Sequence, residues 1–353
     1  MKLLDRRTFA LSLAGSALTT NVRTKARGLD ESRSPTGVDV DKLVRAVAET
    51  VRREYVEEAT AAKIAAVLLR NLASGSYAYS TSRALADRLT DDLRAQTNDL
   101  HMSVTYAPLG PDRDVPNEIS EDDLDSGTIA WGLQTVARLP GNIGLLRVTH
   151  FESGLEMFSA YCSAAMAILR HTAALILDLS LNHGGDSDSA AYMISYFIDG
   201  EVELGRIRFR HSPQKIVKTY KTIDGPRYGE SRPIYVAVSN RTFSAGEALA
   251  WHLKERRGAT LIGRNTRGGA NIGEFFALPS DFRMFVVTAR DLSRNWEGVG
   301  VTPDIPVEPE FAVAMAYRLA LQKLIEGASN ERSRQVLCNV RDHSSENLSS
   351  FAL

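Results

Sequence analysis

The sequence predicts an α/β protein, because its front and middle parts carry two different apolar rhythms. From Val38 to about Gln96, apolar residues recur at helical spacing, which predicts three or four helices in a bundle. From residue 128 onward, short apolar runs alternate with longer helical patterns, which is typical of β-α-β units and of a mostly parallel sheet. A polar loop, Pro108 to Gly127, separates the two parts and is the expected domain boundary.

The individual elements of the middle part can be placed from these runs. The pattern predicts strands at 143–148, 174–179, 234–238, 260–262 and 284–288, and helices at 154–171, 189–198 and 245–256. A last helix is expected at 309–326, where Pro309 fits the first turn, followed by a polar, partly loose tail. We therefore expect an export signal (1–30), an N-terminal helical bundle acting as a cap (38–107), an α/β core (128–310), and a C-terminal helix with its tail (311–353).

Composition excludes several classes of protein. The chain has 42 Lys+Arg against 43 Asp+Glu, a net charge of -1, and 44% hydrophobic residues, so nothing favours nucleic acid or an anionic membrane as a partner. The only two cysteines, Cys162 and Cys338, lack metal-ligand spacing. We interpret both as unpaired, although export would permit a disulfide.

The N-terminus has the layout of an export signal. Lys2, Arg6 and Arg7 precede the uncharged stretch Phe9–Leu18, which is too short for a stable membrane anchor. Arg6-Arg7-Thr8-Phe9 also resembles a twin-arginine signal, which predicts a periplasmic or extracellular protein. The alternative is a slightly basic, frayed N-terminus.

Two junctions between predicted strands and helices carry candidate chemistry, because free backbone N–H groups gather there. The first is D-L-S-L-N-H-G-G (178–185), where a buried strand runs into paired glycines. Such a turn lets a backbone N–H approach a substrate carbonyl, as an oxyanion hole requires. The alternative is a tight turn that needs glycine only for its shape.

The second junction places Ser244 between the strand 234–238 and the following helix. A serine hydroxyl at a helix N-terminus is exposed there, and the helix dipole favours developing negative charge. However, Ser244 and Glu247 also have the spacing of a capping box. Glu247 therefore either helps to position the serine or caps the helix, and we favour the cap.

Together with Thr302-Pro-Asp-Ile305, these junctions resemble the C-terminal-processing, or tail-specific, serine protease family. The turn at 178–185 resembles the family's D-L-R-x-N-x-G-G motif, T-F-S-A-G-E-A-L-A resembles its nucleophile segment, and N-W-E-G-V-G-V-T-P-D its W-E-G-x-G-V-x-P-D ending. The similarity is to the branch of the interphotoreceptor retinoid-binding protein modules and their bacterial relatives. It implies a crotonase-like (ClpP-like) core.

The resemblance also implies roles for residues of both junctions. Ser244 would attack a peptide carbonyl, and the N–H groups of Gly184 or Gly185 and of Ala245 would hold the oxyanion. Asp178, at the end of the buried strand, would support the site.

The general base is not the family's usual one. Classical members use a lysine in T-x-G-K-G, but the matching segment here is Thr266-Arg-Gly-Gly269, so Gly269 stands at the lysine position. Arg267 is a poor substitute, because a guanidinium does not readily give up a proton.

A second branch, resembling tricorn protease, pairs its serine with a histidine from the helical front and a later glutamate. His101 and Glu297 stand at the matching positions, so we predict a Ser244, His101 and Glu297 triad. The tricorn pattern has a serine before the histidine, where this chain has Leu100. Glu297 would thus bind His101 directly, reach it through water, or serve only structure.

Other polar residues are assigned to structure. His183, in the glycine turn, is expected to serve the loop, and His150, His171, His211, His252 and His343 have no partner spacing. No metal-ligand motif or phosphate-binding loop appears, so neither a metal nor another cofactor is predicted.

The resulting hypothesis is a serine endopeptidase acting on exported proteins or peptides through an acyl-enzyme. The alternative is a non-catalytic binder of small apolar ligands or peptide tails on the same scaffold. The sequence predicts no oligomeric state.

Overall fold

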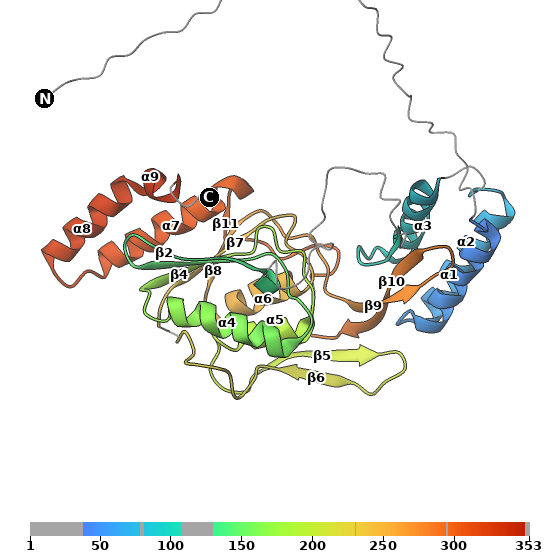
Figure 1. Ribbon diagram of the computed structural model, residues 1–353, viewed down its shortest axis with the longest axis horizontal. Coiled ribbons are helices and arrows are strands. Elements are labelled where there is room, and N and C mark those ends of the chain that lie inside the picture. Colours follow the sequence, from blue (N-terminus) through green and yellow to red (C-terminus); the bar gives the residue numbers. More distant parts are fainter. Residues whose placement is uncertain (1–37, 78–80, 108–129, 230, 294–295, 350–353) are drawn as a thin grey trace, which may run out of the picture.

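The computed structural model describes residues 38–77, 81–107, 130–229, 231–293 and 296–349, which form a mixed α/β protein (Figure 1). The predicted export signal and the predicted polar loop lie outside these residues. Among the described residues, no helix is both long and apolar enough to cross a membrane. Both cysteines are unpaired, as the sequence suggested.

The structure contains the following elements in the described part of the chain. The helices are α1 (Val40–Glu54), α2 (Glu58–Ala73), α3 (Ser82–Thr97), α4 (Leu155–Leu169), α5 (Ser187–Ile194), α6 (Ala245–Arg257), α7 (Pro309–Glu326), α8 (Glu331–Asp342) and α9 (Ser344–Ser349). The strands are β1 (Ser103–Tyr106), β2 (Leu133–Leu139), β3 (Ile143–Val148), β4 (Ala174–Asp178), β5 (Glu203–Phe209), β6 (Lys215–Lys218), β7 (Ile234–Val238), β8 (Thr260–Gly263), β9 (Ile272–Ala277), β10 (Phe282–Asp291) and β11 (Ile305–Pro306).

The central sheet is the mostly parallel sheet that the sequence predicts. Its strand order is β11-β8-β7-β4-β3-β2, and only the β2–β3 pair is antiparallel. β4 and β7 are buried along their whole length, which explains their continuous apolar sequences. Because parallel strands end at the same edge, the segments that follow β4 and β7 lie together there.

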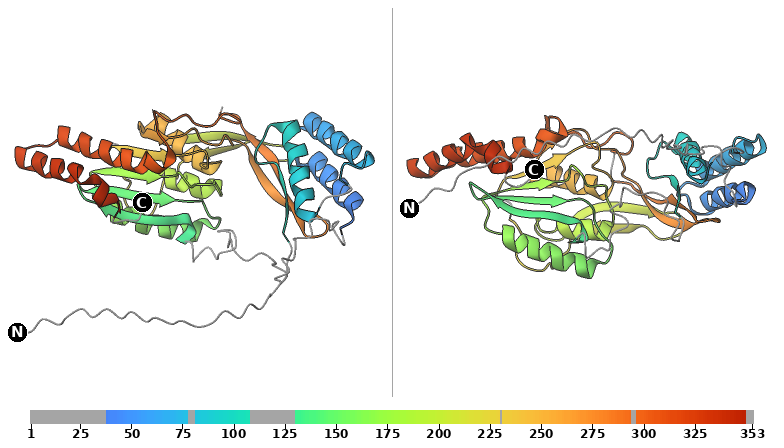
Figure 2. Two further views of the ribbon diagram at one scale, coloured as in Figure 1. Left: turned by 90° about the horizontal axis from the view of Figure 1, so that it is seen from above. Right: turned by 45° about the horizontal axis from the view of Figure 1, so that its top comes forward.

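Helices cover both faces of this sheet. Residues that alternate along each strand separate into two cores: Leu175 and Leu177 of β4 pack on the side of α4, α5 and α6, whereas Ile176 packs on the side of α7. Figure 2 shows α7 and α8 extending together at one end of the molecule. The predicted loose tail instead contains helices, because partly buried Leu337 and Val340 join the α7 core.

A second sheet, absent from the sequence prediction, links the core to the N-terminal helices. It has the order β1-β10-β5-β6, with β9 also paired to β10, and all its pairs are antiparallel. Helices α1–α3 share one apolar core with Phe282, Met284 and Val286 of β10. The front part is therefore helices packed on strands rather than a bundle of helices alone (Figure 2).

Candidate active site

Ser244 occupies the sharp turn between β7 and α6. Its backbone has φ 51° and ψ -116°, which lies outside the regions that non-glycine residues normally populate. Such a conformation persists only where its surroundings enforce it, and it is enriched at functional sites. The side chain is half-buried at the first turn of α6, as the sequence predicted.

Glu247 holds this turn from inside the protein. Its side chain is fully buried and accepts hydrogen bonds from the Ser244 N–H (2.9 Å), the Gly268 and Gly269 N–H groups (2.7 Å each) and the Thr266 hydroxyl. Burial raises the pKa of Glu247 despite these four donors. Glu247 thus does more than cap α6: it ties the Ser244 turn to the segment 266–271.

The glycine turn after β4 lies directly against Ser244. A Cβ on Gly184 would lie 2.8 Å from the Ser244 Cβ, and Gly184 and Gly185 have φ values of 100° and 121°. Asn182, fully buried, joins the two turns, because its carbonyl accepts the Phe243 N–H and its side chain accepts the Gly184 N–H. Glycine is therefore required at 184 both by conformation and by close approach.

Two backbone N–H groups remain available beside the serine. The Gly184 N–H is already used by Asn182 (2.9 Å). Among the described residues, the N–H groups of Gly185 and Ala245 have no hydrogen-bond acceptor. Of the three predicted oxyanion donors, these two are therefore free to bind a substrate oxygen.

His101 lies on the turn that connects α3 to β1. Asn98 ends α3 in the left-handed conformation, and β1 then pairs with β10. Arg94 of α3 holds the turn by donating to the carbonyls of Leu100 (2.8 Å) and Met102 (3.0 Å). These contacts fix His101 at the junction between the N-terminal helices and the core.

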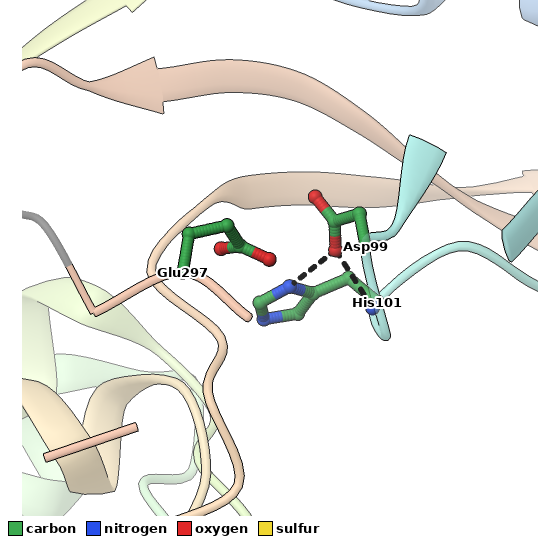
Figure 3. Close-up of side chains that lie close together, drawn as sticks. All are labelled: Asp99, His101 and Glu297. Carbon is green, nitrogen blue, oxygen red and sulfur yellow. Dashed lines mark hydrogen bonds and ion pairs between the residues drawn. The ribbon is translucent and has the colours of Figure 1, made fainter. Parts of the chain in front are cut away.

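The ring of His101 is bound by Asp99, not by Glu297 (Figure 3). The Nδ1 atom of His101 lies 3.0 Å from Asp99 Oδ1, which also accepts the His101 backbone N–H at 2.9 Å. The other oxygen of Asp99 accepts the Asn271 side-chain amide at 2.8 Å. Burial raises the pKa of Asp99, but the hydrogen bonds from His101 and Asn271 outweigh it, so the net pKa lies below its usual value.

Glu297 lies beside this pair without bonding to the ring. Its Oε2 accepts the backbone N–H groups of Ala270 (2.6 Å) and Asn271 (3.0 Å), and its Oε1 has no hydrogen-bond partner among the described residues. Burial and the charge of Asp99 raise the pKa of Glu297. Of the arrangements left open by the sequence, the direct Glu297–His101 hydrogen bond is absent.

Phe243, the residue before Ser244, packs against His101. The rings of Phe243 and His101 are 4.4 Å apart between centroids. His101 Nε2 is buried and has no hydrogen-bond partner among the described residues, so the bond to the Ser244 hydroxyl is not formed here. Catalytic hydrogen bonds are often open in ligand-free enzymes and close when substrate binds.

The other predicted residues have separate contacts. Asp178 is buried and binds Arg147 at 2.7 Å and Ser180, so it stabilises the end of β4. His183 is exposed and stacks on His150 at 5.2 Å. Arg267 is exposed, with its guanidinium carbon 5.0 Å from the centroid of the Phe243 ring.

Asp99, Asn182 and Asn271 were missed by the sequence reasoning. The signal for Asp99 was present in Asp99-Leu-His101, since a carboxylate commonly accepts the N–H two residues further on. No local pattern indicates a role for Asn271, because its partner Asp99 is 172 positions away in the chain.

Three of these side chains have atoms of the type that bind metals. Such atoms of Asp99, His101 and Glu297 lie within 4.8 Å of one another. Nδ1 of His101, both oxygens of Asp99 and one oxygen of Glu297 already make hydrogen bonds inside the protein. We therefore interpret the group as a hydrogen-bonding network.

Comparisons with known proteins find similarity to peptidases. Residues 142–307 match the model of peptidase family S41. The chain is 27% identical over 216 residues to a carboxy-terminal-processing protease of Bartonella bacilliformis, covering 59% of this chain and 47% of that protein. It thus spans less than half the length of the curated relatives that it matches.

Solved structures agree on the fold. A putative peptidase from Parabacteroides merdae superposes with a TM-score of 0.54 and 17% identity, covering 80% of this chain and 96% of that one. Tricorn protease superposes with a TM-score of 0.52 and 14% identity, covering 82% of this chain and 37% of that one. Residues 142–307 of this chain thus match a peptidase family S41 domain, and the curated relative to which the chain is similar is a carboxy-terminal-processing protease.

Proposed function

We propose that the chain is a serine-type peptidase that hydrolyses peptide bonds through an acyl-enzyme on Ser244. The observation that carries this proposal is the Ser244 turn itself. It combines a strained serine at the start of α6 with two N–H groups, of Gly185 and Ala245, that lack acceptors among the described residues. A nucleophile beside free amide donors is the arrangement that acyl transfer needs.

The chemistry follows from these groups. His101 Nε2 takes the proton of the Ser244 hydroxyl while the serine oxygen bonds to the substrate carbonyl carbon. The carbonyl oxygen becomes an oxyanion held by Gly185 and Ala245. The C–N bond then breaks, and the leaving amine takes the proton from His101. Water repeats the sequence on the ester, which releases the acid and restores Ser244.

The segment 266–271 supports histidine rather than lysine as the base. A Cβ on Gly269 would lie 2.6 Å from His101 Cε1 and 2.3 Å from Phe243 Cε2. A longer side chain at this position would therefore displace His101. Glycine at 269 therefore leaves the space that the His101 ring occupies.

The substrate, the wider fold and the location belong to the same proposal. The similarity to carboxy-terminal-processing proteases suggests a peptide or protein substrate. The parallel sheet with helices on both faces suggests the crotonase-like core implied by the sequence. The basic and apolar N-terminal segment suggests export to the periplasm or the exterior.

Covalent labelling with a fluorophosphonate probe tests the proposal. We expect labelling of the purified wild type, none of Ser244→Ala, and at least about 100-fold slower labelling of His101→Ala, since general-base catalysis contributes about 10²–10⁴-fold. Ser159, a half-buried residue of α4, provides a matched control, and Ser159→Ala should label like the wild type. A folded wild type that does not react would contradict the proposal and favour a non-catalytic binder, to be examined with retinoids and fatty acids.

A further inference from the structure

Two carboxylates lie beside His101, and the structure distinguishes their contacts. Asp99 is hydrogen-bonded to the ring at Nδ1, whereas the hydrogen bonds of Glu297 go to the backbone of Ala270 and Asn271. Asn271 joins the two, because its backbone N–H binds Glu297 and its side-chain amide binds Asp99. The contacts therefore form a chain from Glu297 through Asn271 and Asp99 to His101.

From this chain of contacts we infer that Asp99 is the positioning residue of the base, and that Asn271 holds Asp99 in place. Glu297 makes no hydrogen bond to His101, and its hydrogen bonds fix the backbone of Ala270 and Asn271. The catalytic part of this inference rests on the proposed function. The part that concerns the tautomer and orientation of the His101 imidazole does not depend on it.

The physical argument starts from the tautomer of His101. An ionised carboxylate can only accept hydrogen bonds, so the 3.0 Å contact with Asp99 requires the proton on Nδ1. In a neutral imidazole this leaves the lone pair on Nε2. Nε2 is the buried nitrogen without a partner among the described residues, and it is the atom that must accept the serine proton.

Asp99 also sets the direction of the ring. Its Oδ1 accepts both the backbone N–H and Nδ1 of His101, which closes a short loop between two residues of one turn. The rings of Phe243 and Phe285 flank His101 at centroid distances of 4.4 Å and 5.9 Å. Hydrogen bonding and packing together leave one orientation for the imidazole.

The Asn271–Asp99 contact gives this arrangement a further property. Asp99 belongs to the N-terminal part of the chain and Asn271 to the core, and the bond between them is buried. The base is consequently complete only when the N-terminal helices are docked on the core. Neither part holds the whole arrangement by itself.

The tautomer can be measured without any substrate. In protein labelled with ¹⁵N-histidine, at a pH where the ring is neutral, His101 is assigned by comparison with His101→Gln. We expect the Nδ1–H form in the wild type and a decrease of about tenfold or more in the Nδ1–H to Nε2–H ratio in Asp99→Asn. Glu297→Gln should change the ratio by less than about threefold. An unchanged ratio in Asp99→Asn, or an equal change in both variants, overturns the inference.

Chemical rescue tests the same inference through reactivity. Asp99→Ala should label with fluorophosphonate at least about 100-fold more slowly than the wild type, and added formate should restore part of the rate. Asp91→Ala, an exposed aspartate of α3, is the matched control and should label normally. Normal labelling of Asp99→Ala, or a loss that formate does not restore, contradicts the positioning role.

The two experiments separate the inference from the proposed function. A wild type that fails to label refutes the peptidase proposal, while the tautomer measurement still decides the role of Asp99. If Asp99→Asn does not fold, Asn271→Ala serves instead, because it keeps Asp99 but removes its support. Asn271→Ala should lower the Nδ1–H to Nε2–H ratio of His101 by about threefold or more, and an unchanged ratio in that variant counts against the inference.

Discussion

The serine turn and the histidine turn are held in two different ways. Ser244 is placed by residues of the core, since Glu247 three positions later binds its N–H and the glycine turn after β4 packs against it. His101 is placed by Asp99, whose second oxygen binds Asn271, a residue 172 positions away. The nucleophile is therefore held within the α/β core, whereas the base depends on a contact between the core and the N-terminal part of the chain.

This difference predicts that the two halves of the site respond differently to mutation. The serine turn is part of the packed core, so its disruption should appear mainly as lost stability. An arrangement assembled across an interface can be displaced without unfolding either part. Predictions for the serine turn therefore concern the free energy of unfolding, and those for the histidine turn concern reactivity.

The largest effect is expected from Glu247→Ala. The change leaves four hydrogen-bond donors without their acceptor in a fully buried position, so we expect a loss of at least about 3 kcal/mol in the free energy of unfolding. Urea denaturation followed by circular dichroism measures it. Glu255→Ala, exposed on the same helix, should change stability by less than about 0.5 kcal/mol. Equal stabilities of Glu247→Ala and Glu255→Ala would contradict the role of Glu247 in holding the serine turn.

Gly269→Ala should separate reactivity from stability. The new methyl group overlaps His101 Cε1 and the Phe243 ring, and a displacement of about 1 Å at a reacting group costs about 100-fold in rate. We expect fluorophosphonate labelling to fall by about that factor while the protein stays folded. Gly327→Ala, whose nearest contact would be 3.6 Å, is the control. Normal labelling of Gly269→Ala would show that the site tolerates a larger residue beside the base.

Arg94→Met should weaken the histidine turn from the side of the N-terminal helices. Arg94 donates to the carbonyls on both sides of His101, and each such bond contributes about 1 kcal/mol or more. We expect labelling to slow by about three- to tenfold. Arg88→Met on the same helix, which breaks only an exposed pair with Asp92, should have no effect on the rate. If both variants behave alike, the Arg94 contacts do not orient the base.

The smallest effect is the pH dependence that Glu247 contributes. Because burial raises the pKa of Glu247, the folded protein retains a proton that the unfolded chain releases. Stability from this group is therefore present at low pH and is lost as the pH rises from the ordinary glutamate range through the folded pKa. The wild type should lose stability relative to Glu247→Gln across that interval in urea titrations. A constant difference between the two proteins would contradict the raised pKa.

Much of the fold could be predicted, for reasons visible in particular elements. The strand 234–238 and the helix 309–326 were placed correctly, because continuous apolar runs and helical spacing are properties of the segments themselves. β5 and β6 were missed, since their charged, partly exposed sequences resemble loops until an antiparallel partner is known. The prediction of an N-terminal bundle made of helices alone was wrong in one respect, because strand residues near 284 complete the core of these helices.

The candidate site shows the same division. The sequence by itself determined the peptidase S41 motifs, the serine turn and a histidine just after the N-terminal helices. Each of these features consists of residues that are adjacent in the chain. Only the tertiary structure decided which carboxylate binds His101, which glycine N–H stays free, and why position 269 carries no side chain. These features depend on distances between residues that are far apart in the chain, and no local pattern encodes such distances.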